Sequence, residues 1–577
     1  MDYLEAYESW LNDPYFDEKT KAELLAIKDN DGEIKERFYM NLQFGTAGLR
    51  GIIGAGTNRM NIYVVRKTTQ GLANYIISQN GQEKGVAIAY DSRHMSPEFA
   101  KEAALTLAAN GIRAYYFESL RPTPELSYAV RTLGCISGIN ITASHNPPEY
   151  NGYKVYWEDG AQITPPHDTG IMDAVRAVAE WKDVKTMDEK EAADKGLFRI
   201  IGAEIDDKYD AELKSHVLHQ EAIDAEGKNL KIIYTPLHGT GNIPARRVLK
   251  ELGFEHVFVV PEQEKPDGDF PTVSYPNPEA TEAFALGLKY AKEQDADLVL
   301  ATDPDADRLG VRVKDHDGVY HTLTGNMSGS LLADYEIGQR LAVNGSLPED
   351  GKLVKTIVTT NMADAIADYY HVGLIETLTG FKFIGQQILK MEQTGKGHYL
   401  FGFEESYGCL PATYARDKDA IVAVMILCEA AAYYRTQGKT LWDVMTELYE
   451  RYGFYKDSVK SIEMKGISGL EQIKKVMENF RGNTPKEIGG CRVLKARDYK
   501  KDEIVDLESG EKTETGLPKS NVLYYDLTDG AWVCIRPSGT EPKVKFYFGV
   551  KGRTMDDANE KAEQMADALE KLVEENS

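Results

Sequence analysis

The sequence has few cysteines and no excess of basic residues, and each shortage excludes a class of protein. Its five cysteines are odd in number, widely spread and without a Cys-x-x-Cys pair, which disfavours a disulfide scaffold and fits a reducing cytoplasm. The formal net charge is −24, so a nucleic acid or an anionic membrane would be repelled. An anionic small molecule would need basic residues gathered locally.

Long apolar runs are also missing. The longest, residues 420–428, is closed by Glu429 and is too short to cross a bilayer, so we expect a buried helix there. The first ten residues, MDYLEAYESW, are acidic and lack the basic and apolar regions of a signal peptide. These features and the cysteine pattern predict a cytoplasmic protein. The sequence leaves the oligomeric state open between a monomer and a small homo-oligomer.

The 577 residues are too many for one hydrophobic core and indicate roughly three to five domains. Residues 1–40 have apolar positions at helical spacing and are expected to form a helical extension. A loose repeat follows, in which strands alternate with helices and each copy ends at a polar loop. The predicted strands are 86–90, 112–117 and one ending near Ser144; 231–234, 257–260 and 298–302; and 353–359, 374–378 and 399–401.

This alternation predicts parallel, doubly wound α/β units, which bind ligands at the carboxyl ends of their strands. After residue 450 the pattern changes, and a linker is expected around Tyr452–Lys456. Residues 522–527 and 531–535 are predicted to form a hairpin around Asp529-Gly530, followed by a strand over 544–550 and a helix beginning at Thr554.

The first polar loop lies in the segment 139–154, INITASHNPPEYNGYK, and carries a serine. Pro147 and Pro148 forbid a continuing helix or central strand, so Ser144 is placed at a strand end. His145, the backbone donors of the turn, or a cation could activate the serine as a nucleophile. A turn without chemistry is the alternative on this stretch alone.

The second polar loop carries carboxylates at alternate positions directly after an apolar strand: Asp303, Asp305 and Asp307. They would repel one another unless a hard cation lay between them, which predicts Mg²⁺. An EF-hand is excluded, because its sixth position would be Arg308 and its twelfth Lys314. A solvated acidic turn is the alternative.

Glycine-rich loops supply further candidates. Arg50 follows the turn-forming glycines 45 and 48, and the loop 536–543 combines an arginine, two hydroxyls and a glycine, which suits a phosphate. A solvated arginine and an ordinary hairpin loop are the alternatives. The loop Gly239-Thr-Gly241 hints at a dinucleotide fingerprint, but Pro244 occupies the third glycine position and disfavours a nicotinamide cofactor.

Together the motifs TASHNP, DPDADR, GFEES and RPSGTEPK resemble, in order and spacing, those of the α-D-phosphohexomutase superfamily, and the resemblance covers essentially the whole chain. The branch it resembles most contains phosphoglucomutases and phosphopentomutases. The resemblance implies three repeated doubly wound α/β domains and a C-terminal α+β domain around a central cleft. The expected domains are 1–205, 206–323, 324–450 and 451–577.

The resemblance also implies roles for individual residues. Ser144 would be carried as a phosphoserine and would bind Mg²⁺ with Asp303, Asp305 and Asp307. The general acid or base is left open among His145, Lys154 and Lys418. The expected sugar and phosphate contacts are Arg50, Arg308, Thr379, Glu404 and Ser406, and those of the phosphate that is not transferred are Arg536, Ser538, Gly539 and Thr540.

The expected activity is interconversion of glucose 1-phosphate and glucose 6-phosphate, with glucose 1,6-bisphosphate as intermediate and activator. The sugar loop is GFEESYG, where many glucose-specific members have GEESFG. Phosphopentomutase and phosphomannomutase therefore stay open as alternatives on the same scaffold. A Mg²⁺-dependent sugar phosphatase and a non-catalytic sugar-phosphate binding protein are the alternatives from other classes.

Overall fold

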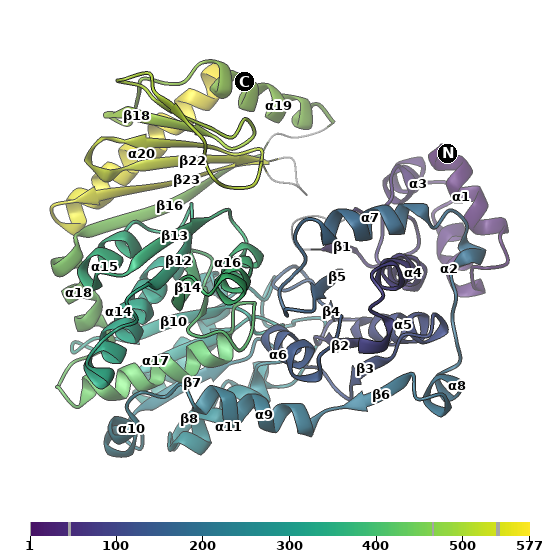
Figure 1. Cartoon of the computed structure of the whole chain (residues 1–577), viewed down its shortest axis with the longest axis horizontal. Coiled ribbons are helices and arrows are strands. Elements are labelled where there is room, and N and C mark those ends of the chain that lie inside the picture. The colour runs from purple at the N-terminus through teal and green to yellow at the C-terminus, as the bar shows by residue number, and fades with distance from the viewer. Residues whose placement is uncertain (1, 44–47, 464–466, 538–542, 577) are drawn as a thin grey trace. The chain divides into compact units, whose positions relative to one another are not determined.

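The computed structural model describes residues 2–43, 48–463, 467–537 and 543–576. The chain forms two compact units, which are described separately below. The first contains Met1–Thr322, Gly385–Thr394 and Gly408–Gly438, and the second contains Leu323–Ile384, Gly395–Tyr407 and Lys439–Ser577. Figure 1 labels the elements and colours them in chain order.

The first unit opens with the predicted helical extension: α1 (Tyr3–Asn12), α2 (Glu18–Ala26) and α3 (Asp31–Phe38). Asp2 begins α1 with a capping box, in which its side chain and that of Glu5 bond each other's backbone N–H groups. The rings of Trp10 and Phe16 stack 4.1 Å apart and contact Tyr63 of α4. An aromatic cluster thus fixes the extension to the domain that follows it.

The first domain is a sheet in the order β1-β5-β4-β2-β3-β6. β2, β3, β4 and β6 are parallel, whereas β5 runs antiparallel to both β4 and β1. Helices cover both faces, which explains why β2 and β4 are buried along their whole length. The elements are β1 (Leu49–Ile52), α4 (Ile62–Ser78), β2 (Val86–Tyr90), α5 (Ser96–Ala109), β3 (Ala114–Phe117), α6 (Thr123–Leu133), β4 (Ser137–Ile141), β5 (Tyr150–Trp157), α7 (His167–Ala177), α8 (Glu189–Asp194), β6 (Phe198–Ile201) and α9 (Ala203–Lys214).

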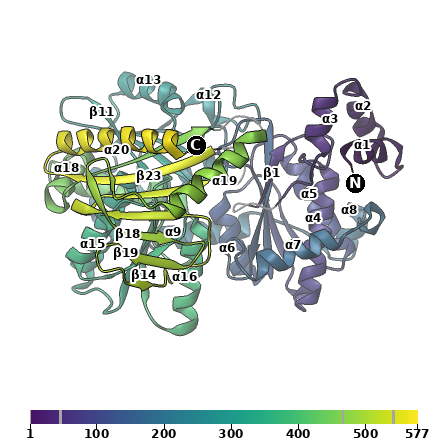
Figure 2. The same cartoon turned by 90° about the horizontal axis from the view of Figure 1, so that it is seen from above.

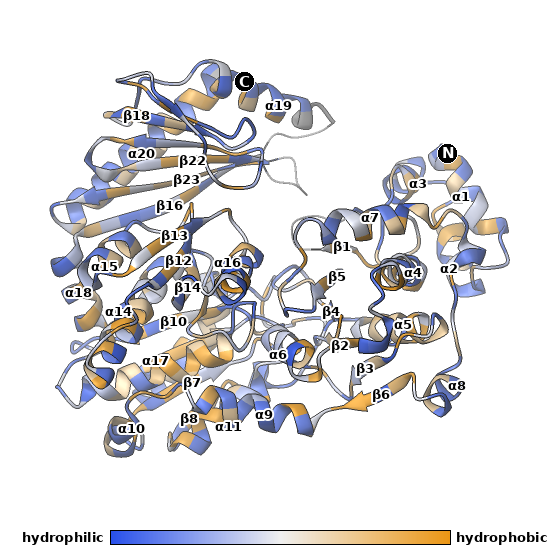
Figure 3. Cartoon of the chain, viewed as in Figure 1, coloured by the Kyte–Doolittle hydropathy of each residue, from blue (hydrophilic) through white to orange (hydrophobic). Residues whose placement is uncertain are grey.

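The second domain has the sheet order β11-β10-β9-β7-β8, with β7 parallel to β8 and β9. The elements are α10 (Gln220–Glu226), β7 (Lys231–Thr235), α11 (Asn242–Leu252), β8 (His256–Val259), α12 (Pro261–Glu264), α13 (Ala285–Gln294), β9 (Leu298–Thr302), β10 (Leu309–Lys314) and β11 (Tyr320–Leu323). The apolar run at 420–428 forms the expected buried helix, α17 (Ala420–Arg435), which packs on α10 and α11 and is predominantly hydrophobic in Figure 3.

The second unit holds the third parallel sheet and the C-terminal sheet. In the third parallel sheet, β12 lies between β13 and β14 and runs parallel to both. Its elements are α14 (Gly325–Asn344), β12 (Gly351–Thr356), α15 (Met362–Tyr370), β13 (Gly373–Thr377), β14 (His398–Glu404) and α18 (Leu441–Tyr452). Helix α16 (Phe381–Thr394) is divided between the units, and β15 (Gly408–Leu410) belongs to the first.

The C-terminal sheet is antiparallel, in the order β16-β23-β22-β21-β18-β19-β20, with β17 beside β18. Helices α19 and α20 pack on β23 (Figure 2). The elements are β16 (Phe454–Glu463), α19 (Ile467–Gly482), β17 (Glu487–Ile488), β18 (Cys491–Asp498), β19 (Glu503–Asp506), β20 (Lys512–Thr513), β21 (Leu523–Leu527), β22 (Trp532–Pro537), β23 (Lys543–Gly552) and α20 (Met555–Asn576).

The predicted fold class is confirmed, and two local predictions were wrong. The strand predicted over 353–359 ends at Thr356, because Thr359 turns back and its backbone N–H donates to the Thr356 carbonyl at 3.1 Å. A linker was expected around Tyr452–Lys456. Instead Tyr452 ends α18, and Phe454 begins the ten-residue strand β16, which pairs with β23. No helix among the described residues is long and apolar enough to span a membrane.

Candidate active site

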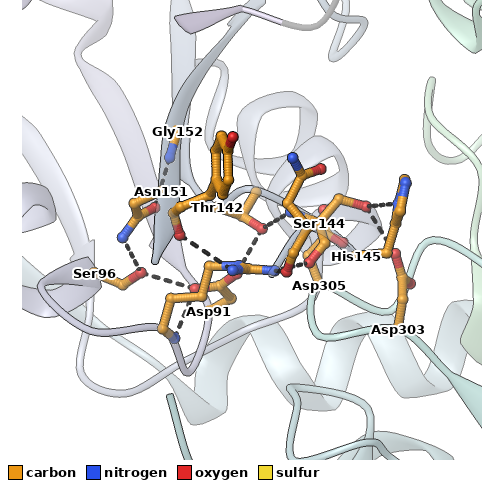
Figure 4. Close-up of polar contacts among 12 residues, drawn as sticks. Asp91, Ser96, Thr142, Ser144, His145, Asn151, Gly152, Asp303 and Asp305 are labelled. Carbon is orange, nitrogen blue, oxygen red and sulfur yellow. Dashed lines mark hydrogen bonds and ion pairs between the residues drawn. The ribbon is translucent and has the colours of Figure 1, made fainter. Parts of the chain in front are cut away.

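Ser144 lies in the loop after β4, buried, and it adopts a left-handed backbone conformation with φ +52°. Its backbone N–H donates to Thr142 Oγ1 at 2.8 Å, which holds this turn. The Ser144 hydroxyl donates to Asp303 Oδ2 at 2.8 Å, and His145 Nδ1 lies 3.2 Å from Ser144 Oγ (Figure 4). A left-handed serine stores strain, which the surrounding bonds must offset.

The aspartate loop follows β9, and Asp303, Asp305 and Asp307 are all buried. One oxygen from each carboxylate lies within 4.8 Å of the others. The Oδ1 atoms of Asp305 and Asp307 are buried and have no hydrogen-bond partner within the described ranges. Buried carboxylate oxygens left in this state are what a hard cation coordinates, so the residues fit a divalent metal site.

Two lysines neutralise part of this negative charge. Lys154, on β5, places Nζ 2.9 Å from Asp305 Oδ2 and 3.8 Å from Asp307 Oδ2. Lys418 places Nζ 3.0 Å from Asp307 Oδ2. The next residue, Asp419, accepts hydrogen bonds from the first backbone N–H groups of α17, and this cap fixes the position of Lys418. The predicted lysines therefore reach the predicted carboxylates.

The carboxylates differ in proton affinity. Burial, together with the charges of Asp307 and Asp305, raises the pKa of Asp303 well above its ordinary value. Burial acts on Asp305 in the same direction, but the Lys154 charge and the hydrogen bonds from Lys154 and Thr123 together outweigh it, and the pKa of Asp305 is lowered. Burial would lower the pKa of Lys154, yet Asp305 and Asp307 raise it. In this state Lys154 holds its proton.

Two further cationic side chains, Arg50 and Arg308, lie near His145, the residue after Ser144. Burial and the nearby charge of Arg308 lower the pKa of Arg50 to about 10. Burial also lowers the pKa of His145 well below its ordinary value, and the charges of Arg308 and Arg50 reinforce that effect. Arg50 donates to Asn146 Oδ1 at 2.8 Å, and Arg308 donates to Glu279 at 2.8 Å. The expected local gathering of basic residues is present.

The second unit carries the candidate sugar residues. Glu404, at the end of β14, is buried, and its Oε1 accepts a hydrogen bond from the backbone N–H of Gly380 at 2.9 Å. This bond brings the loop that contains Thr379 beside Glu404. Ser406 lies two residues further along the same chain segment and is partly exposed. These residues sit at the carboxyl ends of parallel strands, as the repeat predicts.

Arg536 lies near the end of β22 in the same unit. Burial raises the pKa of the Tyr547 phenol, the charge of Glu405 raises it further and the charge of Arg536 lowers it, so both charged groups lie near this ring. Arg536 is thus close to the residue that follows Glu404. The other predicted phosphate contacts, Ser538, Gly539 and Thr540, lie outside the described residues.

Several residues that support the centre were missed from the sequence. Thr123, at the start of α6, donates from its hydroxyl to Asp305 Oδ2 at 2.7 Å and from its backbone N–H to the Asp305 carbonyl at 2.9 Å. Asp91 and Arg93 follow β2 and organise the serine loop, as shown below. Their position directly after an apolar strand was the available signal, because the other polar loops follow strands in the same way.

A glycine explains how the two loops meet. A Cβ on Gly239 would lie 2.4 Å from Pro304 Cα. The next residue, Thr240, donates its backbone N–H to the Pro304 carbonyl at 2.8 Å. The Gly239-Thr-Gly241 loop thus packs against the aspartate loop, which gives its first glycine a structural reason independent of any dinucleotide.

The fold and this centre define an α/β protein in which a buried serine, three carboxylates and converging cations are arranged for phosphoryl transfer. The chain matches all four described domains of one family. These are the phosphoglucomutase/phosphomannomutase alpha/beta/alpha domains I, II and III over residues 41–181, 207–318 and 324–452, and the C-terminal domain over 469–568. The chain belongs to the phosphoglucomutase/phosphomannomutase family.

Named relatives agree. A phosphoglucomutase of Staphylococcus aureus strain MSSA476 is 36% identical over 538 residues, which is 93% of this chain and 95% of the relative. A phosphoglucomutase of Staphylococcus saprophyticus is 36% identical over 522 residues, covering 90% and 93%. The open form of parafusin, a phosphoglucomutase from Paramecium, shares the fold with a TM-score of 0.66 at 18% identity, covering 93% and 95% of the two chains.

Proposed function

We propose that this protein is a phosphoglucomutase, an isomerase that interconverts α-D-glucose 1-phosphate and glucose 6-phosphate through a phosphorylated Ser144. The observation that carries the proposal is the buried contact between Ser144 Oγ and Asp303 Oδ2 at 2.8 Å, inside a carboxylate triad with unpartnered oxygens. Relatives named phosphoglucomutase, 36% identical over nearly the whole chain, support glucose as the sugar.

The reaction uses two phosphoryl transfers. In the first, the phosphoserine O–P bond breaks as a hydroxyl of the sugar monophosphate bonds to phosphorus, and the hydroxyl proton passes to a base. Glucose 1,6-bisphosphate results. After the intermediate turns around, the serine oxygen takes the other phosphoryl group, and the proton returns to the departing sugar oxygen. The base remains open among His145, Lys154 and Lys418; His145 has a lowered pKa and lies 3.2 Å from the serine oxygen.

The triad and Ser144 would hold Mg²⁺, which when bound supplies positive charge opposite the transferring phosphoryl group. Lys154 and Lys418 contact the same carboxylates and would add positive charge at the serine oxygen. Arg50 and Arg308 would orient the phosphate and the sugar from the cationic side. In this way an acidic protein can bind an anionic substrate, because its cations converge on one loop.

In the second unit, Thr379, Glu404 and Ser406 would bind sugar hydroxyls. Arg536, with Ser538, Gly539 and Thr540, would bind the phosphate that is not being transferred. The four domain bounds, 1–205, 206–323, 324–450 and 451–577, are part of the same proposal. The partners are small sugar phosphates, and we propose a cytoplasmic location and a monomeric or small homo-oligomeric state.

A coupled assay tests the proposal. Purified protein with Mg²⁺ and a trace of glucose 1,6-bisphosphate should convert glucose 1-phosphate to glucose 6-phosphate, read out by NADPH from glucose-6-phosphate dehydrogenase. Release of inorganic phosphate at the same rate would support a sugar phosphatase instead. Binding of glucose 1-phosphate without turnover would support a non-catalytic binding protein. Faster turnover of ribose or mannose phosphates would identify a phosphopentomutase or a phosphomannomutase.

A further inference from the structure

Arg93 is buried, and its guanidinium bonds a single loop from several directions. Nη1 donates to the carbonyl oxygens of Pro147 at 2.8 Å and Tyr150 at 3.1 Å. Nη2 donates to the carbonyl of Ser144 at 2.6 Å and also to that of Asn146. All these acceptors lie between residues 144 and 150. One side chain therefore fixes the backbone of the whole serine loop.

Asp91 completes the arrangement on the other side of the loop. Its carboxylate accepts hydrogen bonds from the Arg93 backbone N–H at 3.0 Å and the Thr142 hydroxyl at 2.6 Å. It also lies 3.4 Å from Arg93 Nε, with both side chains fully buried. Because Thr142 Oγ1 gives its proton to Asp91, its lone pairs face the Ser144 N–H (Figure 4). Arg93 and Asp91 thus hold Ser144 from its carbonyl and its amide.

A segment of the second domain covers this pair. The ring of Phe270 lies 5.0 Å from the Arg93 guanidinium carbon and is fully buried, with its backbone in a left-handed conformation at φ +45°. Beside it, His94 Nε2 lies 2.7 Å from Asp269 Oδ1. The aromatic face stabilises a buried guanidinium and restricts it to one plane. The domain that carries the aspartate triad therefore also orients the arginine that shapes the serine loop.

We propose that Arg93, held by Asp91 and Phe270, is a positioning residue for phosphoryl transfer, which keeps Ser144 in its left-handed conformation with Oγ directed at the triad. The inference rests on the proposed function. Arg93 donates its hydrogen bonds to backbone carbonyls of the loop and so acts through the position of Ser144. A displacement of the nucleophile by about 1 Å lowers rates by about 100-fold, which sets the expected size of the effect.

Arg93→Ala tests the proposal, with Arg59→Ala as the matched control. Arg59 is also a buried arginine of the first unit, but it pairs with Glu33 and Glu36 of the N-terminal extension. We expect Arg93→Ala to lower kcat about 100-fold, with KM for glucose 1-phosphate within about threefold of wild type. Added guanidinium ion should restore much of the lost rate in Arg93→Ala and none in the control. Arg93→Lys should stay impaired, because one ammonium cannot reach the four carbonyls.

Phe270→Leu gives a second measurement that does not depend on Arg93→Ala folding. It keeps an apolar side chain but removes the aromatic face, so kcat should fall severalfold with KM unchanged, and the loss should disappear in an Arg93→Lys background.

A folded Arg93→Lys with wild-type kcat would overturn the proposal, as would a Phe270→Leu enzyme with unchanged kcat. Wild-type protein without mutase activity would contradict the proposed function instead, and the variants would then be compared by the rate at which acetyl phosphate phosphorylates Ser144.

Discussion

Ser144 Oγ and Asp303 Oδ2 lie 2.8 Å apart although 159 positions separate them in the chain. This hydrogen bond joins two different domains. It connects the serine loop after β4 to the aspartate loop after β9. Each loop follows a buried parallel strand, and the strand end fixes its direction. A nucleophile and a cation site are brought together by this contact, and the predictions below depend on it.

Metal binding should stabilise the folded protein. Without a cation the buried carboxylates of Asp303, Asp305 and Asp307 repel one another, so Mg²⁺ at 100 times its Kd should add about 2.7 kcal/mol to the free energy of unfolding. Differential scanning fluorimetry with and without EDTA measures this. Asp305→Asn should lose both the thermal shift and mutase activity, whereas the control Asp315→Asn, at a surface turn, should keep both. An equal Mg²⁺ shift in wild type and Asp305→Asn would contradict the metal assignment.

Asp457 should make the stability of the C-terminal sheet depend on pH. Burial raises the pKa of Asp457 to about 6, against the opposing effects of Thr360 and Lys355. Its Oδ1 is buried and has no hydrogen-bond partner within the described part of the chain. Between pH ~4 and ~6 the folded state therefore binds a proton that the unfolded state releases, and the unfolding free energy falls as pH rises through this window.

The matched substitution is Asp457→Asn, which stays neutral at every pH. The difference in melting temperature between this variant and wild type should grow from pH 4 to pH 6 and then level off. At pH 7 the variant should be the more stable by about 1 kcal/mol or more. Asp529→Asn, in the exposed turn before β22, is the control and should not show this trend. Parallel curves for wild type and Asp457→Asn would show that Asp457 does not titrate in this range.

Arg536 should act on the phosphate that is not transferred. Arg536→Ala removes a charge-assisted contact of about 2 kcal/mol, so kcat/KM should fall about 30-fold in both reaction directions. Phosphorylation of Ser144 by acetyl phosphate, which has no second phosphate, should be nearly unchanged. Arg553→Ala, an exposed arginine of the same domain, is the control. Equal losses with both donors would place Arg536 in the chemical step or in folding.

Glu404 should determine which sugar is preferred. Its Oε1 already orders the loop at Gly380, so Glu404→Gln should weaken both that bond and the bonds to sugar hydroxyls. We expect wild type to prefer glucose 1-phosphate over ribose 1-phosphate and mannose 1-phosphate, and the variant to lose most of that preference. The kcat/KM values for the three sugars decide this. A wild-type preference for ribose would change the assignment to phosphopentomutase.

The repeat and the chemistry of its loops could be predicted because both are local. Asp303, Asp305 and Asp307 stand at alternate positions after an apolar run, and their mutual repulsion indicates a cation whatever the rest of the fold. The end of β4 before Ser144 is likewise marked by Pro147 and Pro148. For these elements, strand periodicity and loop composition were sufficient, and the strand bounds differ from prediction by only a few residues.

Other features depend on contacts between distant segments. Phe270 covers Arg93 from another domain, and no local pattern around either residue indicates the pairing. The prediction of a linker at 452–456 was wrong for the same reason. Phe454 belongs to a strand that pairs with a distant segment, and its partner Gly552 lies about a hundred positions away in the chain. The left-handed turn at Ser144 also depends on side chains elsewhere, Thr142 and Arg93.

The central claim is that Ser144 carries the phosphoryl group, and a phosphoenzyme chase measures it directly. Protein treated with glucose 1,6-bisphosphate should gain the mass of one phosphoryl group, mapped to the peptide containing Ser144. If that phosphoryl group carries an isotopic label, the label should pass to the sugar within one turnover after glucose 6-phosphate is added, because Ser144 takes back the other, unlabelled phosphoryl group. Ser144→Ala should fold, gain no phosphoryl group and lack mutase activity, while the control Ser78→Ala behaves as wild type. Mutase turnover by folded Ser144→Ala, or a phosphoryl group that the sugar cannot remove, would contradict the account.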